Sequence, residues 1–350
     1  MSADQIVAPE ASLASPQQSK LPMAAHRFAV LDGWRALSIL LVLLGHLLPL
    51  GPASLGLNNA VAACGMVIFF ILSGFLITRF LSEGADLRSF LIRRFFRIIP
   101  LAWAAMVVIL LAANAPASAW FGNLLFYANL PPQTLVVPSG SHLWSLCVEM
   151  QFYVGIAAFV AIARRRSLIL VVFFALAVTA MRVYSHAYLD IVTWRRGDEI
   201  LCGSVLALIY AGRYGRLPQR VLEWINAWWL LPLLLLAAHP FGGPLNYARP
   251  YIAMLAVGST LFAPPPLMAR IFESRIAAYI ATVSYAVYII HGALSASWLG
   301  SGPTLVKYAK RPLLFALTFG LAHLSTFYFE RPLNEWARRR TRGHPIRIGA

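Results

Sequence analysis

The chain has 350 residues, of which 59% are hydrophobic and only 12% are charged. A soluble domain has about twice that share of charged residues, so these side chains could not cover a water-facing surface. The formal charge of +16 is typical of nucleic-acid-binding proteins. The basic residues lie in short clusters between apolar runs, however, which is typical of the loops of a multi-pass membrane protein. We therefore expect no nucleic-acid partner, and a location in the lipid bilayer of the cell inner membrane.

The chain begins with a polar segment rich in Pro, Ser and Ala, and this segment lacks the apolar core of a signal peptide. We interpret residues 1–26 as a disordered cytoplasmic tail. Residues 27–332 form one predicted membrane domain, and residues 333–350 form a second, basic cytoplasmic tail.

Ten apolar segments approach the length of about 20 residues that a membrane-spanning helix needs. They predict an all-α fold, a polytopic bundle of about ten transmembrane helices. The segments are 30–50, 57–79, 98–115, 142–163, 167–184, 197–212, 224–239, 248–263, 276–298 and 311–329. Residues 119–130 are apolar but few, which favours a re-entrant or interfacial position.

The distribution of basic residues sets the orientation of this bundle. With the N-terminus in the cytoplasm, 21 of the 29 Lys and Arg residues fall on the cytoplasmic side and seven on the outer side, while Arg35 lies within the first helix. This threefold excess satisfies the positive-inside rule. Both termini are therefore expected in the cytoplasm.

The first predicted helix carries two ionisable residues, Arg35 and His46. They are eleven residues apart, so they share one face of the helix and lie ~16 Å apart along its axis. The structural interpretation is a snorkelling arginine and a hydrogen-bonded core histidine. Because ionisable groups inside a membrane are costly, the pair on one face favours a functional role.

The second predicted helix ends near Ser73 and Gly74. These small residues favour close packing against another helix, and the Ser73 hydroxyl could alternatively face a ligand.

A basic amphipathic helix follows at the predicted cytoplasmic surface, over residues 87–97. It could anchor to anionic lipid headgroups. Arg94 and Arg97 are i,i+3 neighbours, however, and both guanidinium groups could bind one phosphate.

The fourth predicted helix places His142, Ser145 and Glu149 on one face. We predict Glu149 to be the only acidic residue well inside a membrane helix. It could pair with Arg35 or another buried cation, or it could orient His46 for proton abstraction from a hydroxyl.

The remaining polar signals are weaker. Asp198 begins the sixth predicted helix at the outer surface, where a carboxylate caps a helix N-terminus. His291 lies in the ninth helix and is interpreted as a hydrogen-bonded bundle histidine. Cys64, Cys147 and Cys202 lie in apolar runs without metal-ligand spacing, so we expect packing roles and no metal site.

Six motifs, in order, resemble the acyltransferase family 3 membrane proteins. They are Leu31-Asp32-Gly33-Trp34-Arg35-Ala36 with Arg-x10-His ending at His46, residues 69–78, Arg94-x-x-Arg97, residues 142–153, residues 284–291 and residues 329–332. The family includes bacterial O-antigen, exopolysaccharide and nodulation-factor O-acetylases. Two positions depart from its usual pattern, Cys147 in place of serine and Met150 in place of a second glutamate.

The resemblance implies about ten membrane helices and acyl transfer from cytoplasmic acyl-CoA, often acetyl-CoA. It implies that His46 is the catalytic residue and that Arg35, Arg94 and Arg97 serve the donor. It also implies a hydroxyl acceptor on a cell-envelope or exported saccharide or glycolipid.

The leading hypothesis is therefore a membrane O-acyltransferase with His46 and Glu149 as catalytic residues. Arg35, Arg94, Arg97 and Ser73 would contact the acyl-CoA donor. The candidates for acceptor contact are His142, Trp144, Ser145, Tyr153, Asp198 and His291. His46 would either activate the acceptor hydroxyl or carry the acyl group itself.

Two rival functions stay open at this point. A proton-coupled transporter or exporter could use buried Arg, His and Glu as a relay. A non-catalytic membrane scaffold would not need His46 and Glu149 inside the membrane.

Overall fold

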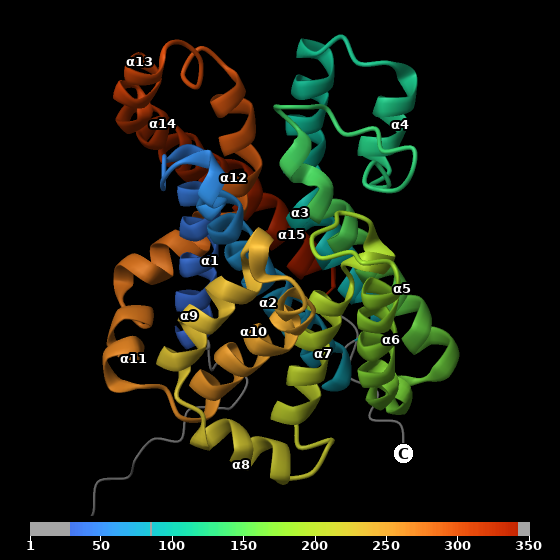
Figure 1. Cartoon of the computed structure of the whole chain (residues 1–350). Helices are drawn as coiled ribbons and strands as arrows, with labels where there is room; N and C mark the ends of the chain where they lie inside the picture. Colours follow the sequence, from blue (N-terminus) through green and yellow to red (C-terminus); the bar gives the residue numbers. More distant parts are fainter. Residues whose placement is uncertain (1–28, 85, 342–350) are drawn as a thin grey trace, which may run out of the picture.

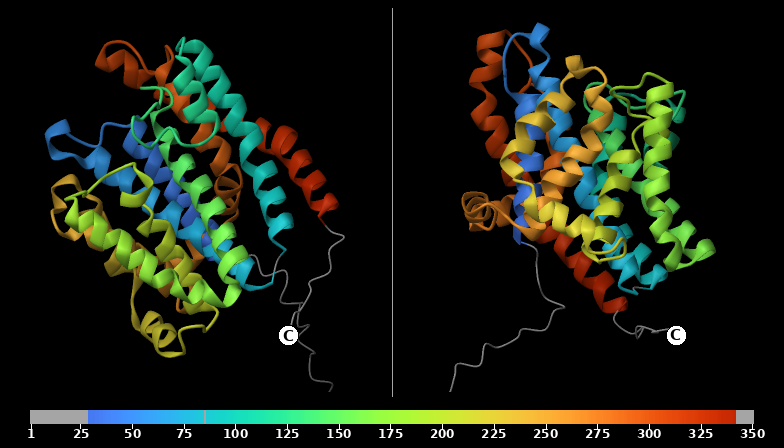
Figure 2. Two further views of the ribbon diagram at one scale, coloured as in Figure 1. Left: turned by 90° about the vertical axis from the view of Figure 1, so that its right-hand side faces the viewer. Right: turned by 60° about the horizontal axis from the view of Figure 1, so that its bottom comes forward.

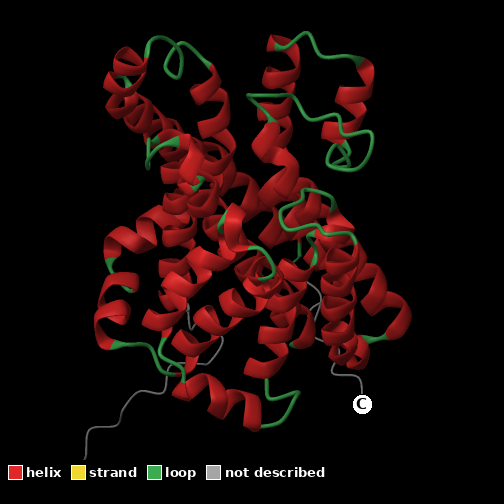
Figure 3. Ribbon diagram, viewed as in Figure 1, coloured by secondary structure: helices red, strands yellow, loops and turns green. Residues whose placement is uncertain are grey.

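The computed structural model describes residues 29–84 and 86–341, and every regular element in these two ranges is a helix (Figures 1 and 3). The predicted tail over residues 1–26 lies outside the described residues. The long helices are α1 (Ala29–Leu47), α2 (Leu57–Ser82), α3 (Leu87–Ala112), α5 (Trp144–Ala163), α6 (Val171–Tyr184), α10 (Leu245–Phe262) and α12 (Arg275–Ala296). The shorter helices are α4 (Ala117–Leu124), α7 (Asp198–Tyr210), α8 (Leu217–Trp224), α9 (Ala227–Ala238), α11 (Pro266–Phe272), α13 (Thr304–Ala309), α14 (Arg311–Leu324) and α15 (Arg331–Arg340).

Seven helical segments in the described ranges are long and apolar enough to cross a membrane, and nine are if two bent helix pairs each count as one span. The multi-pass all-α prediction is thus confirmed, whereas the expected count of ten is not. The predicted span 197–212 corresponds to α7, whose 13 residues extend only about 20 Å. The predicted spans 224–239 and 248–263 fall in the bent pairs α8–α9 and α10–α11.

The basic stretch over residues 87–97 is the beginning of α3. It was expected as a separate surface helix, but it continues without a break into the predicted span 98–115. Asp86 caps this helix, because its carboxylate accepts a hydrogen bond of 2.9 Å from the Ser89 N–H. Arg94 and Arg97 are thereby fixed on the first turns of a long, rigid helix.

The last span is longer than predicted. A π-helical segment, Ser325–Glu330, joins α14 to α15, so the chain stays helical beyond Pro332. Pro332 lies in the first turn of α15, directly after the π-helical segment, so the hydrogen-bond pattern changes where the proline lacks an N–H. Residues 333–340 of the predicted tail therefore belong to α15, which packs beside the beginning of α3 (Figure 2).

The centre of the bundle is α2, which packs extensively against α1 and α7. Glycine makes the contact with α7 possible. A Cβ atom on Gly74 would lie 1.9 Å from the Ile200 carbonyl oxygen, and one on Gly203 would lie 2.1 Å from that of Ile71. Any larger residue would separate the two backbones, so Gly74 has the packing role predicted for it.

A buried network of ion pairs joins α7 to α6 and α10. Arg182 binds Asp198 at 2.5 Å, and Glu199 binds Arg196 at 3.0 Å and Arg249 at 2.7 Å. Asp198 begins α7 as predicted, and Asp198 and Glu199 are both fully buried in this network. Breaking such a pair costs about 3–5 kcal/mol, since it strands a buried charge.

Candidate active site

The imidazole of His46, at the end of α1, forms a hydrogen bond of 3.0 Å from its Nδ1 to Nε2 of His291 on α12. The other ring nitrogen of His291, Nδ1, lies 2.7 Å from the Tyr288 carbonyl oxygen. A carbonyl only accepts, so Nδ1 of His291 carries the proton, and Nε2 of the neutral ring is an acceptor. His46 therefore donates from Nδ1, which leaves the lone pair on its Nε2 free.

This arrangement gives His291 a definite partner. The sequence suggested a bundle histidine or an acceptor contact, but not a bond to His46. The two residues are 245 positions apart, and no local spacing signals the contact.

His142 lies against the same histidine pair, with its ring centroid 4.7 Å from that of His291. Its Nε2 is 3.4 Å from the Ile289 carbonyl oxygen. Gly292 makes room for this ring, because a Cβ atom there would lie 2.1 Å from the His142 Cε1. Three imidazoles are thus packed together at one end of the bundle.

A cavity of about 480 Å³ opens beside these histidines. His46, His142 and Trp144 line it together with Arg196, whose guanidinium lies 5.0 Å from the centre of the Trp144 ring. We call this space the outer cavity. Two of the predicted acceptor contacts, His142 and Trp144, lie here beside His46.

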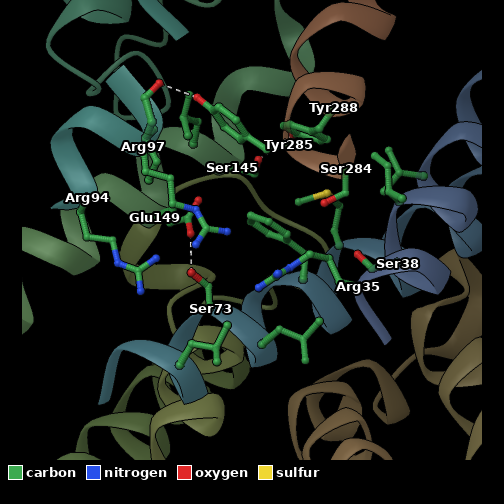
Figure 4. A pocket seen from close by; sticks show the side chains of 18 of the residues that line it. Arg35, Ser38, Ser73, Arg94, Arg97, Ser145, Glu149, Ser284, Tyr285 and Tyr288 are labelled. Atoms are coloured by element: carbon green, nitrogen blue, oxygen red, sulfur yellow. Dashed lines mark hydrogen bonds between the residues drawn. The ribbon is translucent and has the colours of Figure 1, made fainter. Parts of the chain in front are cut away.

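A second, narrower cavity of about 60 Å³ lies deeper in the bundle, and we call it the inner cavity (Figure 4). Arg35, Arg94 and Arg97 extend into it from α1 and α3, around the Glu149 carboxylate of α5. Ser73 of α2 also lines it, so the structure brings together four residues that were predicted to contact the donor.

Glu149 is held by neighbours inside this cavity. Its Oε1 accepts hydrogen bonds from the hydroxyl groups of Ser73 and Tyr153. Tyr153 and Ser145, both predicted as acceptor contacts, line the inner cavity and not the outer one. In the described part of the chain, Glu149 does not contact His46 as predicted, because the two side chains line different cavities. Asp198 and Glu199, in the first turn of α7, are buried acids as well, so burial alone does not distinguish Glu149.

The side chains of Met66 and Tyr288 line both cavities and separate them. The Tyr288 hydroxyl donates to the His142 carbonyl oxygen and forms a bond of 2.6 Å with the Ser145 hydroxyl. Movement of Met66 would therefore connect the cavities with less disruption than movement of Tyr288.

A third cavity, of about 170 Å³, lies on the other side of the inner cavity and shares Arg94 and Arg97 with it. We call it the basic cavity. Arg93 of α3 and Arg338 of α15 complete a set of four arginines, and none of the described residues that line it is acidic. Arg338 was overlooked in the sequence because it was assigned to a tail, although the run Arg338-Arg339-Arg340 marked a basic segment.

Helix α2 connects all three cavities in chain order. Asn59 and Met66 line the outer cavity, Ser73 the inner cavity and Phe80 the basic cavity. Asn59 and Phe80 are 21 positions apart, which corresponds to about 32 Å along the helix, close to the thickness of the bilayer hydrocarbon core. The three cavities therefore follow one another along a helix long enough to span a membrane, with arginines at one end and histidines at the other.

The described part of the chain contains no group of three or more His, Cys, Asp or Glu side chains that could hold a metal ion.

Comparison with known proteins finds one family model over nearly the whole membrane domain. Residues 28–331 match a family described as "Acyltransferase domain". The chain is 28% identical to the peptidoglycan O-acetyltransferase OatA of Listeria monocytogenes, over 87% of the chain and 55% of the relative. It is 25% identical to a Staphylococcus aureus protein provisionally named an O-acetyltransferase, over 87% of the chain and 57% of that protein.

A Bacillus subtilis protein, YrhL, provisionally named a peptidoglycan O-acetyltransferase, is 26% identical over 76% of the chain and 48% of its own length. The chain thus spans about half the length of the curated relatives it matches. No solved structure matches the chain.

Proposed function

Because the chain belongs to the family of the Acyltransferase domain, we propose that it is a membrane O-acetyltransferase that takes its acyl group from acetyl-CoA and passes it to a saccharide hydroxyl. The relatives named as O-acetyltransferases support the reaction class. The Nε2 lone pair of His46, a residue that lines the outer cavity, is the observation on which the chemical role rests.

The donor would bind at the arginine end. Arg93, Arg94, Arg97 and Arg338 offer several guanidinium groups to the phosphates of CoA, with no acidic neighbour in the basic cavity. The excess of Lys and Arg on this side in the sequence favours the cytoplasm, where acyl-CoA is made. The pantetheine arm would then extend through the inner cavity, whose small volume favours an acetyl group.

The acceptor would bind at the histidine end, in the outer cavity. In direct transfer, His46 Nε2 takes the proton of the acceptor hydroxyl, the oxygen attacks the thioester carbonyl, and the CoA sulfur leaves and receives that proton. In a relay, Nε2 attacks the thioester carbonyl first, the C–S bond breaks, and CoA leaves as the thiol with the proton that His46 gives up from Nδ1. The hydroxyl oxygen then attacks the carbonyl of the acyl-imidazole, and the hydroxyl proton returns to the imidazole as the C–N bond breaks. Both routes use the same free nitrogen.

Glu149 supports the donor side of this proposal. Its carboxylate lies among Arg35, Arg94 and Arg97, where it offsets part of their mutual repulsion while the cavity is empty. Ser73 and Tyr153 fix its orientation. We assign Glu149 to the positioning of these arginines and not to the activation of His46.

The proposal is tested with purified full-length protein, radiolabelled acetyl-CoA and a saccharide acceptor. His46→Gln should lower kcat by about a hundredfold or more, because the general base or nucleophile is lost. Binding of acetyl-CoA, measured by thermal shift, should persist, since His46 does not line the donor cavities.

Full transfer by His46→Gln would contradict the assignment, and wild-type protein that neither binds nor consumes acetyl-CoA would instead favour a transporter. Rapid-quench mass spectrometry without acceptor separates the routes, since only the relay gives an acetylated His46.

A further inference from the structure

A fourth cavity lies beside His46 and has no part in the mechanism above. Its volume is about 310 Å³, and it lies between the loop that follows α1 and the residues Lys307, Tyr308 and Arg311 around the start of α14. His46 and Asn59 line both this cavity and the outer cavity. A molecule bound here would therefore lie next to the imidazole proposed to perform the chemistry.

Arg311 is the unusual residue of this cavity. Only 6% of its surface is exposed, and its Nε and Nη1 atoms are buried without any hydrogen-bond partner in the described structure. The ring centre of Tyr308 lies 5.6 Å from its guanidinium carbon. A buried N–H group without an acceptor costs about 1–3 kcal/mol, and more when the group is charged. The other buried arginines of the described ranges, Arg182, Arg196 and Arg249, have carboxylate partners.

The surroundings of Arg311 are basic. Lys307 and His46 also line the cavity, and none of its described lining residues is acidic. Lys310, the neighbour of Arg311, differs because its ammonium group donates to the carbonyl oxygens of Trp298 and Ser301 at 2.6 and 3.0 Å. Lys310 thus stabilises the loop before α13. The Nε and Nη1 donors of Arg311, in contrast, have no acceptor among the described residues.

We propose that this cavity is an anion-binding subsite for the acceptor, in which Arg311, assisted by Lys307, binds a carboxylate or phosphate carried by the saccharide. This inference rests on the proposed function and adds a substrate class to it: the acceptor is anionic. An anion bound here would place a negative charge beside the Arg311 guanidinium, whose Nε and Nη1 atoms have no acceptor among the described residues. The acceptor is then held on one side of His46 while its hydroxyl lies in the outer cavity on the other side.

Binding is tested first, without catalysis. Purified full-length protein is titrated with N-acetylglucosamine, N-acetylmuramic acid and N-acetylglucosamine 1-phosphate by isothermal titration calorimetry. The three sugars share a ring, and only the last two carry an anion. At least one anionic sugar should bind about tenfold or more tighter than the neutral sugar, as expected for a charge-assisted hydrogen bond. The sugar that keeps the advantage distinguishes a carboxylate from a phosphate. Equal affinity for all three sugars would overturn the proposal.

Variants then assign the effect to Arg311. Arg311→Gln should remove the preference for the anion, and Arg311→Lys should keep part of it. Lys307→Gln should reduce it less, because Lys307 is less buried. Arg195→Gln is the matched control, since Arg195 lies near the same end, pairs with Asp190 at 3.0 Å and lines none of the cavities described above. A preference that survives in Arg311→Gln, or that Arg195→Gln removes equally, would contradict the assignment.

Transfer assays separate this inference from the proposed function. In Arg311→Gln, the ratio of kcat/KM for an anionic acceptor to kcat/KM for a neutral acceptor should fall by about tenfold, whereas Arg195→Gln should leave this ratio unchanged. If no acceptor is acetylated by wild-type protein, the proposed function fails, while the calorimetric comparison still decides whether Arg311 binds anions.

Discussion

The hydrogen bond from His46 to His291 determines which nitrogen of His46 is free to react. The bond depends on the Tyr288 carbonyl oxygen, which fixes the tautomer of His291. In the proposed mechanism, the imidazole of His291 would therefore take the positioning role for which the sequence suggested Glu149.

Replacing His291 should affect both the tautomer and the rate. In His291→Phe, Nδ1 of His46 loses its acceptor, so the ring should populate both neutral tautomers and kcat should fall by about a hundredfold. Nitrogen-15 NMR of histidine-labelled protein distinguishes the tautomers and should show an Nδ1–H form in the wild type. Glu149→Gln is the control, because Glu149 lines another cavity and should leave the His46 spectrum unchanged. An unchanged tautomer in His291→Phe would contradict the positioning role.

Local sequence could predict part of this site. The spacing of Arg35 and His46 on one helix predicted a face with a functional role, and these side chains line the inner and outer cavities. The pair Arg94 and Arg97 predicted an anion site. The partner of His46 and the two hydroxyl groups that donate to Glu149 could not be predicted. The contacts His46–His291 and Ser73–Glu149 join residues from different helices, and the contact between Tyr153 and Glu149 within α5 depends on the rotamers that packing permits. The unpaired nitrogens of Arg311 likewise become visible only when the surrounding acceptors are placed.

Among the helices, α15 has the most unexpected role, because it carries Arg338 into the basic cavity. In Arg338→Gln, the KM for acetyl-CoA should rise by about three- to tenfold with little change in kcat, since one guanidinium contact to a phosphate is lost. Arg339→Gln is the matched control on the same helix, because Arg339 lines none of the cavities described above. Steady-state kinetics at constant ionic strength checks this prediction. Equal effects of the two substitutions would show that Arg338 contributes only its net charge and makes no specific contact with the donor.

The contact between α2 and α7 sets the position of Ser73 and therefore of Glu149. Gly203→Ala should destabilise the protein by about 1–3 kcal/mol or more, because the added Cβ meets the Ile71 carbonyl oxygen at 2.1 Å. The midpoint of thermal unfolding in detergent measures the effect. Gly155→Ala provides the control, since a Cβ atom there has no neighbour within 4 Å. A similar midpoint for both variants would show that α2 and α7 can separate without cost.

The lengths of the apolar runs predicted where the helices lie better than they predicted which helices cross the membrane. The apolar run that became α7 had almost the length of a span, yet much of its apolar character serves burial against α2 inside the bundle. The basic start of α3 and the end of the last helix were misassigned for a related reason. Arginine clusters and Pro332 are typical of span ends, but both are compatible with a helix that continues.

In the molecule as a whole, the basic, inner and outer cavities follow one another along α2, and the side chains of Met66 and Tyr288 form the boundary between the last two. This order separates donor from acceptor. Acetyl-CoA would bind on the side of Arg94 and Arg97, and the saccharide on the side of His46. The acetyl group, and not the whole donor, would then reach the far side of the membrane.

Sidedness of transfer in proteoliposomes tests this separation. Protein is reconstituted in one orientation, which is verified by protease access to a tag at the C-terminus, with acetyl-CoA and a membrane-impermeant saccharide supplied on chosen sides. We predict acetylated saccharide only when acetyl-CoA is on the side of Arg94 and Arg97 and the saccharide is on the side of His46, and none with His46→Gln. Product formed only when both substrates are on the same side would contradict the account.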